Sequence, residues 1–236
     1  MLHFNNNINS IHNPRRTTIF LLPLLLLLIT SCKKEEITPS GNQVTETRNP
    51  GAFKMISINS AANIHITHGG NHSVVIKGSD NLIKHFNTTI VNGELKLAFQ
   101  KGNVTSDDLE IRITMPALES ITTSGSGDIK ILGNFDDQHS LTTRVSGSGD
   151  IKVEGSMRTN FLKSYVSGSG TTDLSSIWTN IAEVEIPGSG SIKVNVHEEL
   201  KASITGSGDV YYSGNPTISS NIKGTGKLIK INATND

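Results

Sequence analysis

The sixfold repetition of a short glycine motif constrains this chain more than any other feature. Copies of Gly-Ser-Gly, with Gly-Thr-Gly as the last, begin at Gly125, Gly147, Gly168, Gly188, Gly206 and Gly224. The first glycines of successive copies are 22, 21, 20, 18 and 18 residues apart. A period of about 20 residues is typical of proteins in which each repeat stacks on its neighbours. The sequence therefore predicts a stacked-repeat architecture.

The residues on either side of each motif indicate strands. Positions two and four before the first glycine, and four and six after it, are mostly aliphatic or β-branched, as in Val184 and Ile186 before Gly188 and Ile192 and Val194 after it. Even spacing of apolar residues is the pattern of a strand with one buried face. The glycines between two such strands predict a corner, where glycine supplies backbone angles that other residues resist.

Two all-β folds fit this repeating unit. In a parallel β-helix each copy is one coil, whereas in a meander or barrel each copy is a hairpin. Hairpins more often contain Asn-Gly or Asp-Gly turns, and columns of identical residues favour parallel stacking. We therefore predict a right-handed parallel β-helix, or solenoid, of about six Gly-Ser-Gly coils, with the hand taken from the crossover rule.

The domain boundaries follow from the same patterns. Residues 116–231 contain the Gly-Ser-Gly repeats. Residues 51–115 alternate in strand fashion without the motif, and they predict irregular opening strands that cap the first coil. We expect residues 51–236 to form a single β-helical domain.

The N-terminal segment predicts export and lipidation. Two arginines precede an apolar run of 11 residues at 19–29, which suits a signal peptide and is too short to cross a bilayer as a helix. The run leads to Ile29-Thr-Ser-Cys32, which resembles a bacterial lipobox, and Cys32 is the only cysteine. We predict a lipoprotein signal peptide over residues 1–31 and a lipidated Cys32 that anchors the chain to a membrane. The alternative is an ordinary secretory peptide with an incidental cysteine.

The segment after Cys32 predicts a location. Residues 37–50 contain no apolar periodicity, so residues 32–50 are predicted to be the lipidated cysteine and a flexible tether. The Lys34-Glu-Glu sequence is similar to the surface-export signal of lipoproteins from Bacteroidetes-type bacteria. We therefore expect the outer membrane or cell surface, with the periplasmic face as the alternative. The 21 basic and 21 acidic residues balance, so no basic excess indicates a nucleic-acid partner.

Two groups of side chains are of types that can bind a metal ion. Asp128, Asp150 and Asp209 follow three of the corners, which suggests either a calcium ladder or hydrogen-bonded capping of the corners. Lys227 occupies the same column and would repel a cation, so capping is favoured. His65, His68 and His72 also cluster, but the spacing of three places the first two on opposite faces of a strand. We predict no metal site and no cofactor.

The sequence contains little that resembles a catalytic site. No motif serine lies in a Gly-x-Ser-x-Gly elbow or is paired with a histidine base. Asp173, Glu183 and Glu185 are the acids that a polysaccharide lyase or hydrolase of the β-helix type would use. Glu183 and Glu185 alternate with aliphatic column residues and are therefore expected simply to face solvent. The sequence predicts no catalytic residues.

Several segments together point to a family. Ser73–Asp80, Gly93–Leu97, Ile111–Pro116 and Val210–Pro216, with the Gly-Ser-Gly series, resemble the head GIN domain family of auto-transporter adhesins. These are exported proteins enriched in Bacteroidetes, and the resemblance covers residues 51–231. It implies a β-helical fold and carries over no catalytic residues.

The functional expectation is a non-catalytic binding or adhesion module for a glycan or protein ligand. Aromatic rings suit sugar stacking, and Trp178, Tyr211 and Tyr212 are the predicted ligand contacts, with Tyr165 as the other aromatic platform. Two alternatives remain: a structural envelope component without a ligand, and a β-helix polysaccharide lyase or hydrolase. The sequence leaves the oligomeric state open.

Overall fold

The structure, a computed structural model, describes residues 36–100, 104 and 106–232. The signal peptide over 1–31 and the lipidation site at Cys32 lie outside the described residues. In the described part of the chain, no helix is long and apolar enough to cross a membrane.

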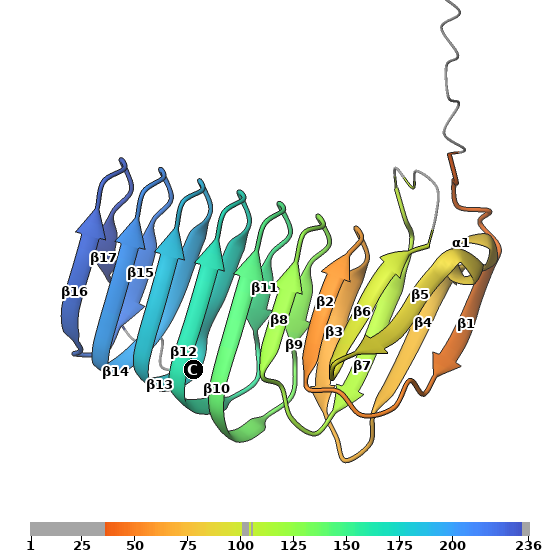
Figure 1. Ribbon diagram of the computed structural model, residues 1–236, viewed down its shortest axis with the longest axis horizontal. Coiled ribbons are helices and arrows are strands. Elements are labelled where there is room, and N and C mark those ends of the chain that lie inside the picture. The colour runs from red at the N-terminus through yellow and green to blue at the C-terminus, as the bar shows by residue number, and fades with distance from the viewer. Residues whose placement is uncertain (1–35, 101–103, 105, 233–236) are drawn as a thin grey trace, which may run out of the picture. The chain divides into compact units, whose positions relative to one another are not determined.

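The described chain consists of strands and one short helix (Figure 1). The elements are β1 Gln43–Arg48, β2 Met55–Asn59, β3 Asn63–His68, β4 Ser73–Ser79, α1 Asp80–His85, β5 Phe86–Val91, β6 Glu94–Phe99, β7 Glu110–Met115, β8 Ser120–Thr123, β9 Ile129–Ile131, β10 Phe135–Val145, β11 Ile151–Val153, β12 Met157–Val166, β13 Thr171–Ile186, β14 Ser191–Ile204, β15 Val210–Ser213, β16 Thr217–Ile222 and β17 Leu228–Lys230.

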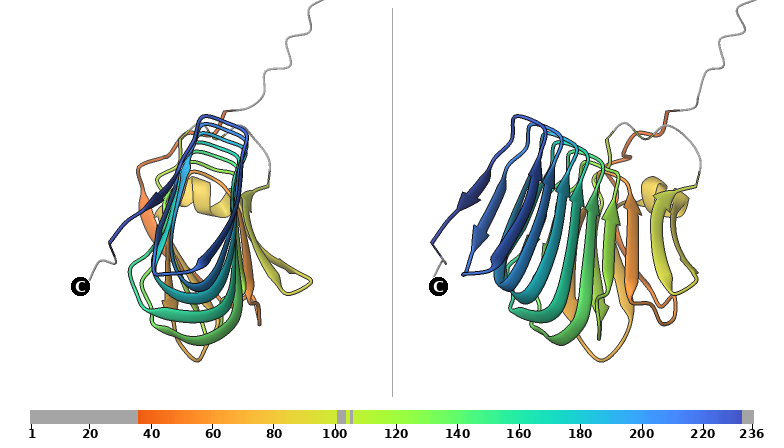
Figure 2. Two further views of the ribbon diagram at one scale, coloured as in Figure 1. Left: turned by 90° about the vertical axis from the view of Figure 1, so that its left-hand side faces the viewer. Right: turned by 60° about the vertical axis from the view of Figure 1, so that its left-hand side comes forward.

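The strands form two facing layers that close into a flattened coil (Figure 2). The front sheet has the order β5, β6, β2, β8, β10, β12, β13, β14, β16, and the back sheet has the order β1, β4, β7, β3, β9, β11, β13, β14, β15, β17. β13 and β14 belong to both sheets because each long strand bends around the lower arc. Within the repeats every pairing is parallel, as expected for a β-helix.

The hand of the coil is visible in Figure 1. The front strands run upward, the chain crosses at the corners, and the back strands run downward. Within the repeats each turn then steps towards β16, at the end opposite α1. This path is a right-handed coil, as the crossover rule predicts.

The corners stack directly on one another and bound five complete turns. The number of complete turns between the Gly-Ser-Gly corners is thus slightly lower than the six coils predicted. A Cβ atom built on Gly168 would lie 1.8 Å from the carbonyl oxygen of Gly147, and one on Gly224 would lie 1.8 Å from that of Gly206. The positive-φ glycines of the described residues lie elsewhere, for example Gly93 and Gly214. The expectation that the corners need glycine for unusual backbone angles is therefore wrong. Glycine is required because the next backbone leaves no room for a side chain.

The predicted inward columns form the core. Residues such as Ile151, Leu174, Ile192 and Val210 are fully buried, and the polar members of the columns pair inside, as where Thr143 Oγ1 donates to Ser164 Oγ at 2.9 Å. Small aliphatic side chains fill the narrow space between the sheets, which explains how a chain with 5% aromatic residues has a continuous core.

Residues 51–115 contain the expected capping elements and two further turns. β2 and β3 pair in parallel with β8 and β9, and β6 and β7 pair in parallel with β2 and β3. The turn over 55–68 therefore lies between 94–115 and the first repeat, in an order that differs from the chain order. Its corner contains Ser60, and a Cβ on Gly125 would lie 1.7 Å from the Ser60 carbonyl oxygen.

The end beside β6 and β7 is closed. β5 and β4 pair antiparallel with β6 and β7, and α1 buries Leu82 and Ile83 against the core. The Arg48 guanidinium donates to the carbonyl oxygens of Ile83, at 2.9 Å, and Phe86. This contact ties β1 to the helix and so holds the cap over the coil end. The prediction of a flexible tether over residues 32–50 is therefore wrong for residues 43–48, which pair with β4 as part of the domain. At the opposite end all of β16 is exposed.

Alanine at a corner tests the stacking directly. We expect Gly168→Ala to lower the free energy of unfolding by about 3 kcal/mol or more, because its Cβ would force two coils apart. Gly70→Ala is the matched control, since a Cβ there meets nothing within 4 Å. Urea unfolding measures both, and equal stability of the two variants would contradict the stacking account.

Candidate functional site

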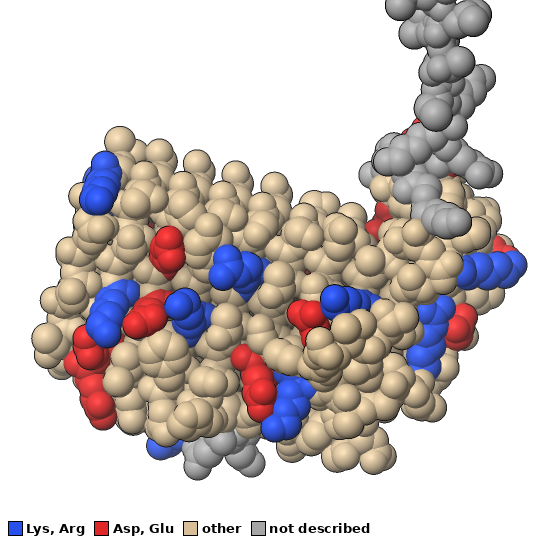
Figure 3. All heavy atoms as spheres, in the orientation of Figure 1, with Lys and Arg blue, Asp and Glu red and all other residues tan. Residues whose placement is uncertain are grey.

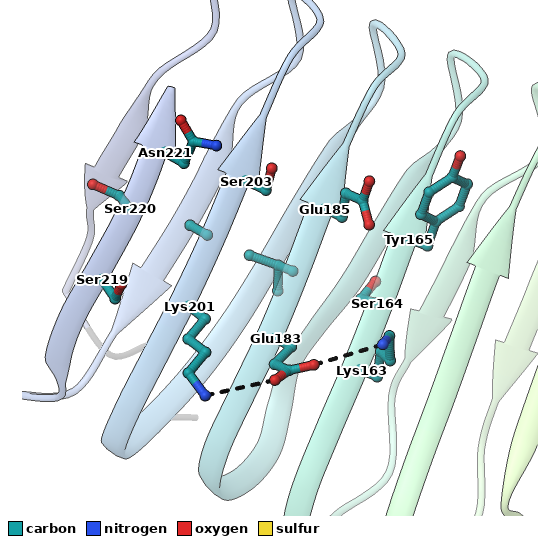
Figure 4. A pocket seen from close by; sticks show the side chains of 12 residues that line it. Lys163, Ser164, Tyr165, Glu183, Glu185, Lys201, Ser203, Ser219, Ser220 and Asn221 are labelled. Atoms are coloured by element: carbon teal, nitrogen blue, oxygen red, sulfur yellow. Dashed lines mark ion pairs between the residues drawn. The ribbon is translucent and has the colours of Figure 1, made fainter. Parts of the chain in front are cut away.

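A groove crosses the outer surface of the front sheet from β12 to β16. It has a volume of about 300 Å³, at the lower end of the range of ligand sites. Two rows of outward side chains form its walls, and the residues between the rows, Ser164, Val184, Ala202 and Ser220, form its floor (Figure 4). Because alternate residues of a strand face opposite ways, the floor exposes mainly backbone to the groove. The groove crosses four strands, a length of roughly 14 Å over three strand spacings.

The first wall is a ladder of alternating charges. Lys163, Glu183 and Lys201 are aligned on neighbouring strands, and Ser219 continues the row. The Glu183 carboxylate lies 3.6 Å from Lys163 Nζ and 3.7 Å from Lys201 Nζ. These pairs are solvated, so they contribute little to stability. They do hold three long side chains in a fixed row, and Figure 3 shows acidic and basic groups side by side in the middle of this face.

The second wall is polar and ends in an aromatic ring. Tyr165, Glu185, Ser203 and Asn221 are aligned on the same four strands. The Arg144 guanidinium carbon lies 4.3 Å from the centre of the Tyr165 ring, within the range of a cation–π contact. Arg144 therefore fixes the ring at the β12 end of the groove.

The three aromatic residues predicted as ligand contacts lie outside this groove. Trp178 is half-buried at the lower arc, where His197 stacks on its ring at 4.2 Å and Arg158 lies 5.5 Å from the ring centre. These two neighbours therefore occupy part of the indole surface that a ligand would need. Tyr211 faces outward on the back sheet, and Tyr212 packs against the end of the core. The structure does not bring these three residues together.

A second hollow of about 400 Å³ lies beside Trp178. Its lining consists of Gln138, His139, Arg158, Thr159, Asn160 and Trp178. Part of the indole surface is already in contact with His197 and Arg158. The hollow therefore offers less stacking surface than the sequence suggested.

The three corner aspartates cap backbone amides of the next coil. Asp128 Oδ1 accepts from the Asp150 N–H at 3.2 Å, Asp150 Oδ1 accepts from the Thr171 N–H at 2.6 Å, and Asp209 Oδ1 accepts from the Lys227 N–H at 2.7 Å. This ladder is the capping role that the sequence favoured over calcium binding. Each carboxylate is already used by a neighbouring coil.

The three histidines have separate contacts. His65 Nδ1 lies 3.6 Å from Glu110, His68 packs edge-on against Phe135, and His72 packs against Phe53 and hydrogen-bonds its carbonyl oxygen. Within the part of the chain that the structure describes, no three His, Cys, Asp or Glu side chains are grouped as a metal site.

The acids proposed for catalysis are divided between the two sheets. Asp173 lies on the back-sheet part of β13, whereas Glu183 and Glu185 face the front groove. Burial would raise the pKa of Asp173, but hydrogen bonds from Ser175 and the ammonium of Lys193 outweigh burial and lower it below its ordinary value. The three carboxylates therefore do not form one catalytic cluster.

Burial raises the pKa of the Asp107 carboxyl above its ordinary value. Its two carboxylate oxygens accept hydrogen bonds from the backbone N–H groups of Ala61, at 3.0 Å, and Leu109, at 3.3 Å. It therefore holds the corner of the 55–68 turn against the segment before β7, a structural role.

Comparison with known proteins agrees with this geometry. A family model described as "Putative auto-transporter adhesin, head GIN domain" matches residues 52–216. The chain belongs to this family. The head GIN resemblance carried by the glycine series and its flanking strands is thereby confirmed. A comparison with curated proteins finds no match.

Solved structures with the same fold come from Bacteroides and Parabacteroides species. A putative adhesin from Bacteroides fragilis is 26% identical, with a TM-score of 0.68 over 83% of this chain and 100% of that chain. A putative adhesin from Parabacteroides merdae is 18% identical, with a TM-score of 0.57 over 84% and 99%. A structure from Parabacteroides distasonis described as a putative lipid binding protein is 18% identical, with a TM-score of 0.52 over 84% and 100%. The family model and the Bacteroides fragilis structure are both described as putative adhesins.

Substitution of a corner aspartate separates capping from calcium binding. We expect Asp150→Ala to lower the free energy of unfolding by about 1 kcal/mol, because the Thr171 N–H loses its acceptor. Asp150→Asn keeps an acceptor oxygen and should retain most of the stability. Thermal unfolding with calcium and with a chelator should give one midpoint, whereas a calcium-dependent midpoint that Asp150→Asn removes would contradict capping.

Proposed function

We propose that this head GIN protein is a lipid-anchored envelope protein that binds an extended glycan in the front-sheet groove without catalysing a reaction. The lipid at Cys32 would hold it at the outer membrane or cell surface. The spacer would lie before β1, because residues 43–48 are part of the back sheet. The observation that supports the groove most strongly is the pair of aligned polar ladders on a continuous sheet.

The chemistry of the walls suits sugar hydroxyls. Ser203, Ser219 and Asn221 supply neutral donors and acceptors, and the charge ladder supplies stronger ones. Tyr165 adds an aromatic surface at one end. Since the side chains project from adjacent strands, their spacing follows the strand spacing and is suited to a chain of repeating units. A rigid scaffold also reduces the entropy lost when the ligand binds.

The same side chains argue against hydrolysis or elimination. Glu183 forms ion pairs with two lysines, and Asp173, whose lowered pKa favours the carboxylate over the proton donor, lies on the other sheet. A glycosidase needs a protonated acid beside a second carboxylate. Binding without turnover is therefore the function that this groove supports best.

Blocking the groove tests the proposal. Ser203→Trp places a large ring between the walls, and Tyr165→Ala removes the aromatic surface. We expect each variant to weaken a glycan ligand, identified with the full chain on a polysaccharide panel, by about tenfold or more, since a good packing or hydrogen-bond contact contributes about 1.4 kcal/mol or more. Calorimetric titration measures the affinity, and reducing-end release is followed in parallel.

Two controls keep this experiment decisive. Ser148→Trp introduces the same ring at an exposed corner, and Tyr211→Ala removes a tyrosine from the back sheet. Both should bind as the wild type does. Unchanged binding by Ser203→Trp and Tyr165→Ala, or release of reducing ends, would contradict the groove as a non-catalytic site.

The anchor has its own test. In cells labelled with a fatty acid, we expect the full chain to be labelled and to sediment with membranes, because a diacylated cysteine inserts two chains. Cys32→Ser should lose the label and leave the membrane fraction, while Ser40→Cys in that background should restore neither. A labelled Cys32→Ser variant would show that the lipobox assignment is wrong.

A further inference from the structure

One end of the coil is covered by a helix, whereas the other ends in an open sheet edge. At one end α1 covers the core between β4 and β5 (Figure 1). At the other end β16 pairs with β14 on one side, and within residues 36–100, 104 and 106–232 no strand pairs with its second side. Figure 2 looks onto this end in its left-hand view. The front sheet therefore ends in a row of free backbone donors and acceptors.

β16 also carries apolar side chains that the rest of the stack would bury. Ile218 and Ile222 occupy inward columns, yet 41% and 43% of their surface is exposed. Leu200 and Ile204, their partners on β14, are fully buried. The strand Thr-Ile-Ser-Ser-Asn-Ile contains no charge and no proline. Natural edge strands usually carry charged residues or proline, which prevent pairing with another chain. β16 contains neither.

The sequence of β16 is symmetric in the way that pairing with itself requires. In an antiparallel pair, residues directly opposite each other share a face of the sheet. If Ser220 lies opposite Ser220 of a second copy, Ile218 lies opposite Ile222 and Ile222 opposite Ile218. Both exposed isoleucines then meet an isoleucine on the inward face. An interface about a two-fold axis needs this kind of self-complementarity.

We propose that β16 pairs antiparallel with β16 of a second copy about a two-fold axis at Ser220, so that the front sheets of two molecules join into one. The front sheet already ends in an antiparallel pair at its other edge, between β5 and β6, so the reversal of direction has a precedent in the same sheet.

The edge of the back sheet, at β17, is not suited to the same pairing. Lys230 occupies an inward column on β17, and its Nζ donates to Asn215 at 2.8 Å. An inward charge is a device that discourages edge pairing. Lys227, directly before β17, adds a second positive charge at this edge, which therefore repels a copy along β17. The contact thus runs along β16, and one such contact per chain closes a dimer.

The pairing would extend the groove. On the outward face the same register places Ser219 of one copy opposite Asn221 of the other. Both residues line the groove where it reaches the sheet edge. The grooves of the two copies would then run into one another and double the length available to an extended ligand. The pairing itself does not depend on which ligand the groove binds.

Sedimentation of the purified full chain in detergent tests the dimer. We expect twice the mass of one chain for the wild type and the mass of one chain for Ile222→Glu. Ile222 is already exposed, so the substitution should not unfold the domain. Leu132→Glu is the matched control, because Leu132 is equally exposed at 41% but lies after β9, away from the open end. This control should remain a dimer.

Cross-linking tests the register. In a Cys32→Ser background, so that the introduced thiol is the only one, Ser220→Cys should form a disulfide-linked dimer under mild oxidation. Ser148→Cys, at an exposed corner, should not. Efficient linkage of both variants would overturn the register, because it would reflect random collision.

Other outcomes of these experiments overturn the proposal. A monomeric wild type refutes the pairing, and if that monomer still binds a glycan, the groove proposal stands without it. Loss of the dimer in Leu132→Glu as well as Ile222→Glu would indicate nonspecific association. Assemblies larger than two chains that Val91→Glu disperses would show head-to-tail contact through β5 instead.

Discussion

The close approach of successive backbones at the corners is the interaction on which this fold depends. Neighbouring strands in a sheet lie about 4.8 Å apart, and at the corners the chain keeps this spacing while it reverses direction. The N–H groups of Ser189 and Ser207 donate across the gap to Gly168 and Gly188 at 3.0 Å. Because a Cβ atom would overlap the preceding carbonyl oxygen, glycine recurs at each step. The corner is therefore part of the hydrogen-bonded ladder and not a loop between strands.

This constraint divides the chain into fixed and free positions. The inward columns must stay small and apolar, and the corners must stay glycine, so chemical variety is left to the outward columns. On the front sheet these columns form the charged and polar walls of the groove. The same regularity creates the open end, since every coil needs a neighbour and the last one has none among the described residues. Ligand binding and self-association thus have a common origin in the repeat.

Much of the fold could be predicted because the repeat is local. The inward columns, the corners and the capping role of Asp150 all follow from residues within one period. The turns at 55–68 and 94–115 could not be recognised as coils, because Ser60-Ala-Ala replaces the glycine motif and their order in space differs from their order in sequence.

The candidate site was harder to predict than the fold. Its signal lay in the columns three and five before each glycine, where Tyr165 aligns with Glu185 and Lys163 with Glu183. The apolar columns between them predicted the core and gave no information about the groove. The prediction of Trp178 as a ligand contact could not take account of His197 and Arg158, because these residues lie far from it in sequence and contact it from neighbouring coils.

The most direct test of the stacking of the corners is amide hydrogen exchange of the full chain. Corner amides such as Ser189 and Ser207 should be protected as strongly as strand amides of β13, whereas exchange as fast as that of the exposed turn at Gly70 would contradict the account.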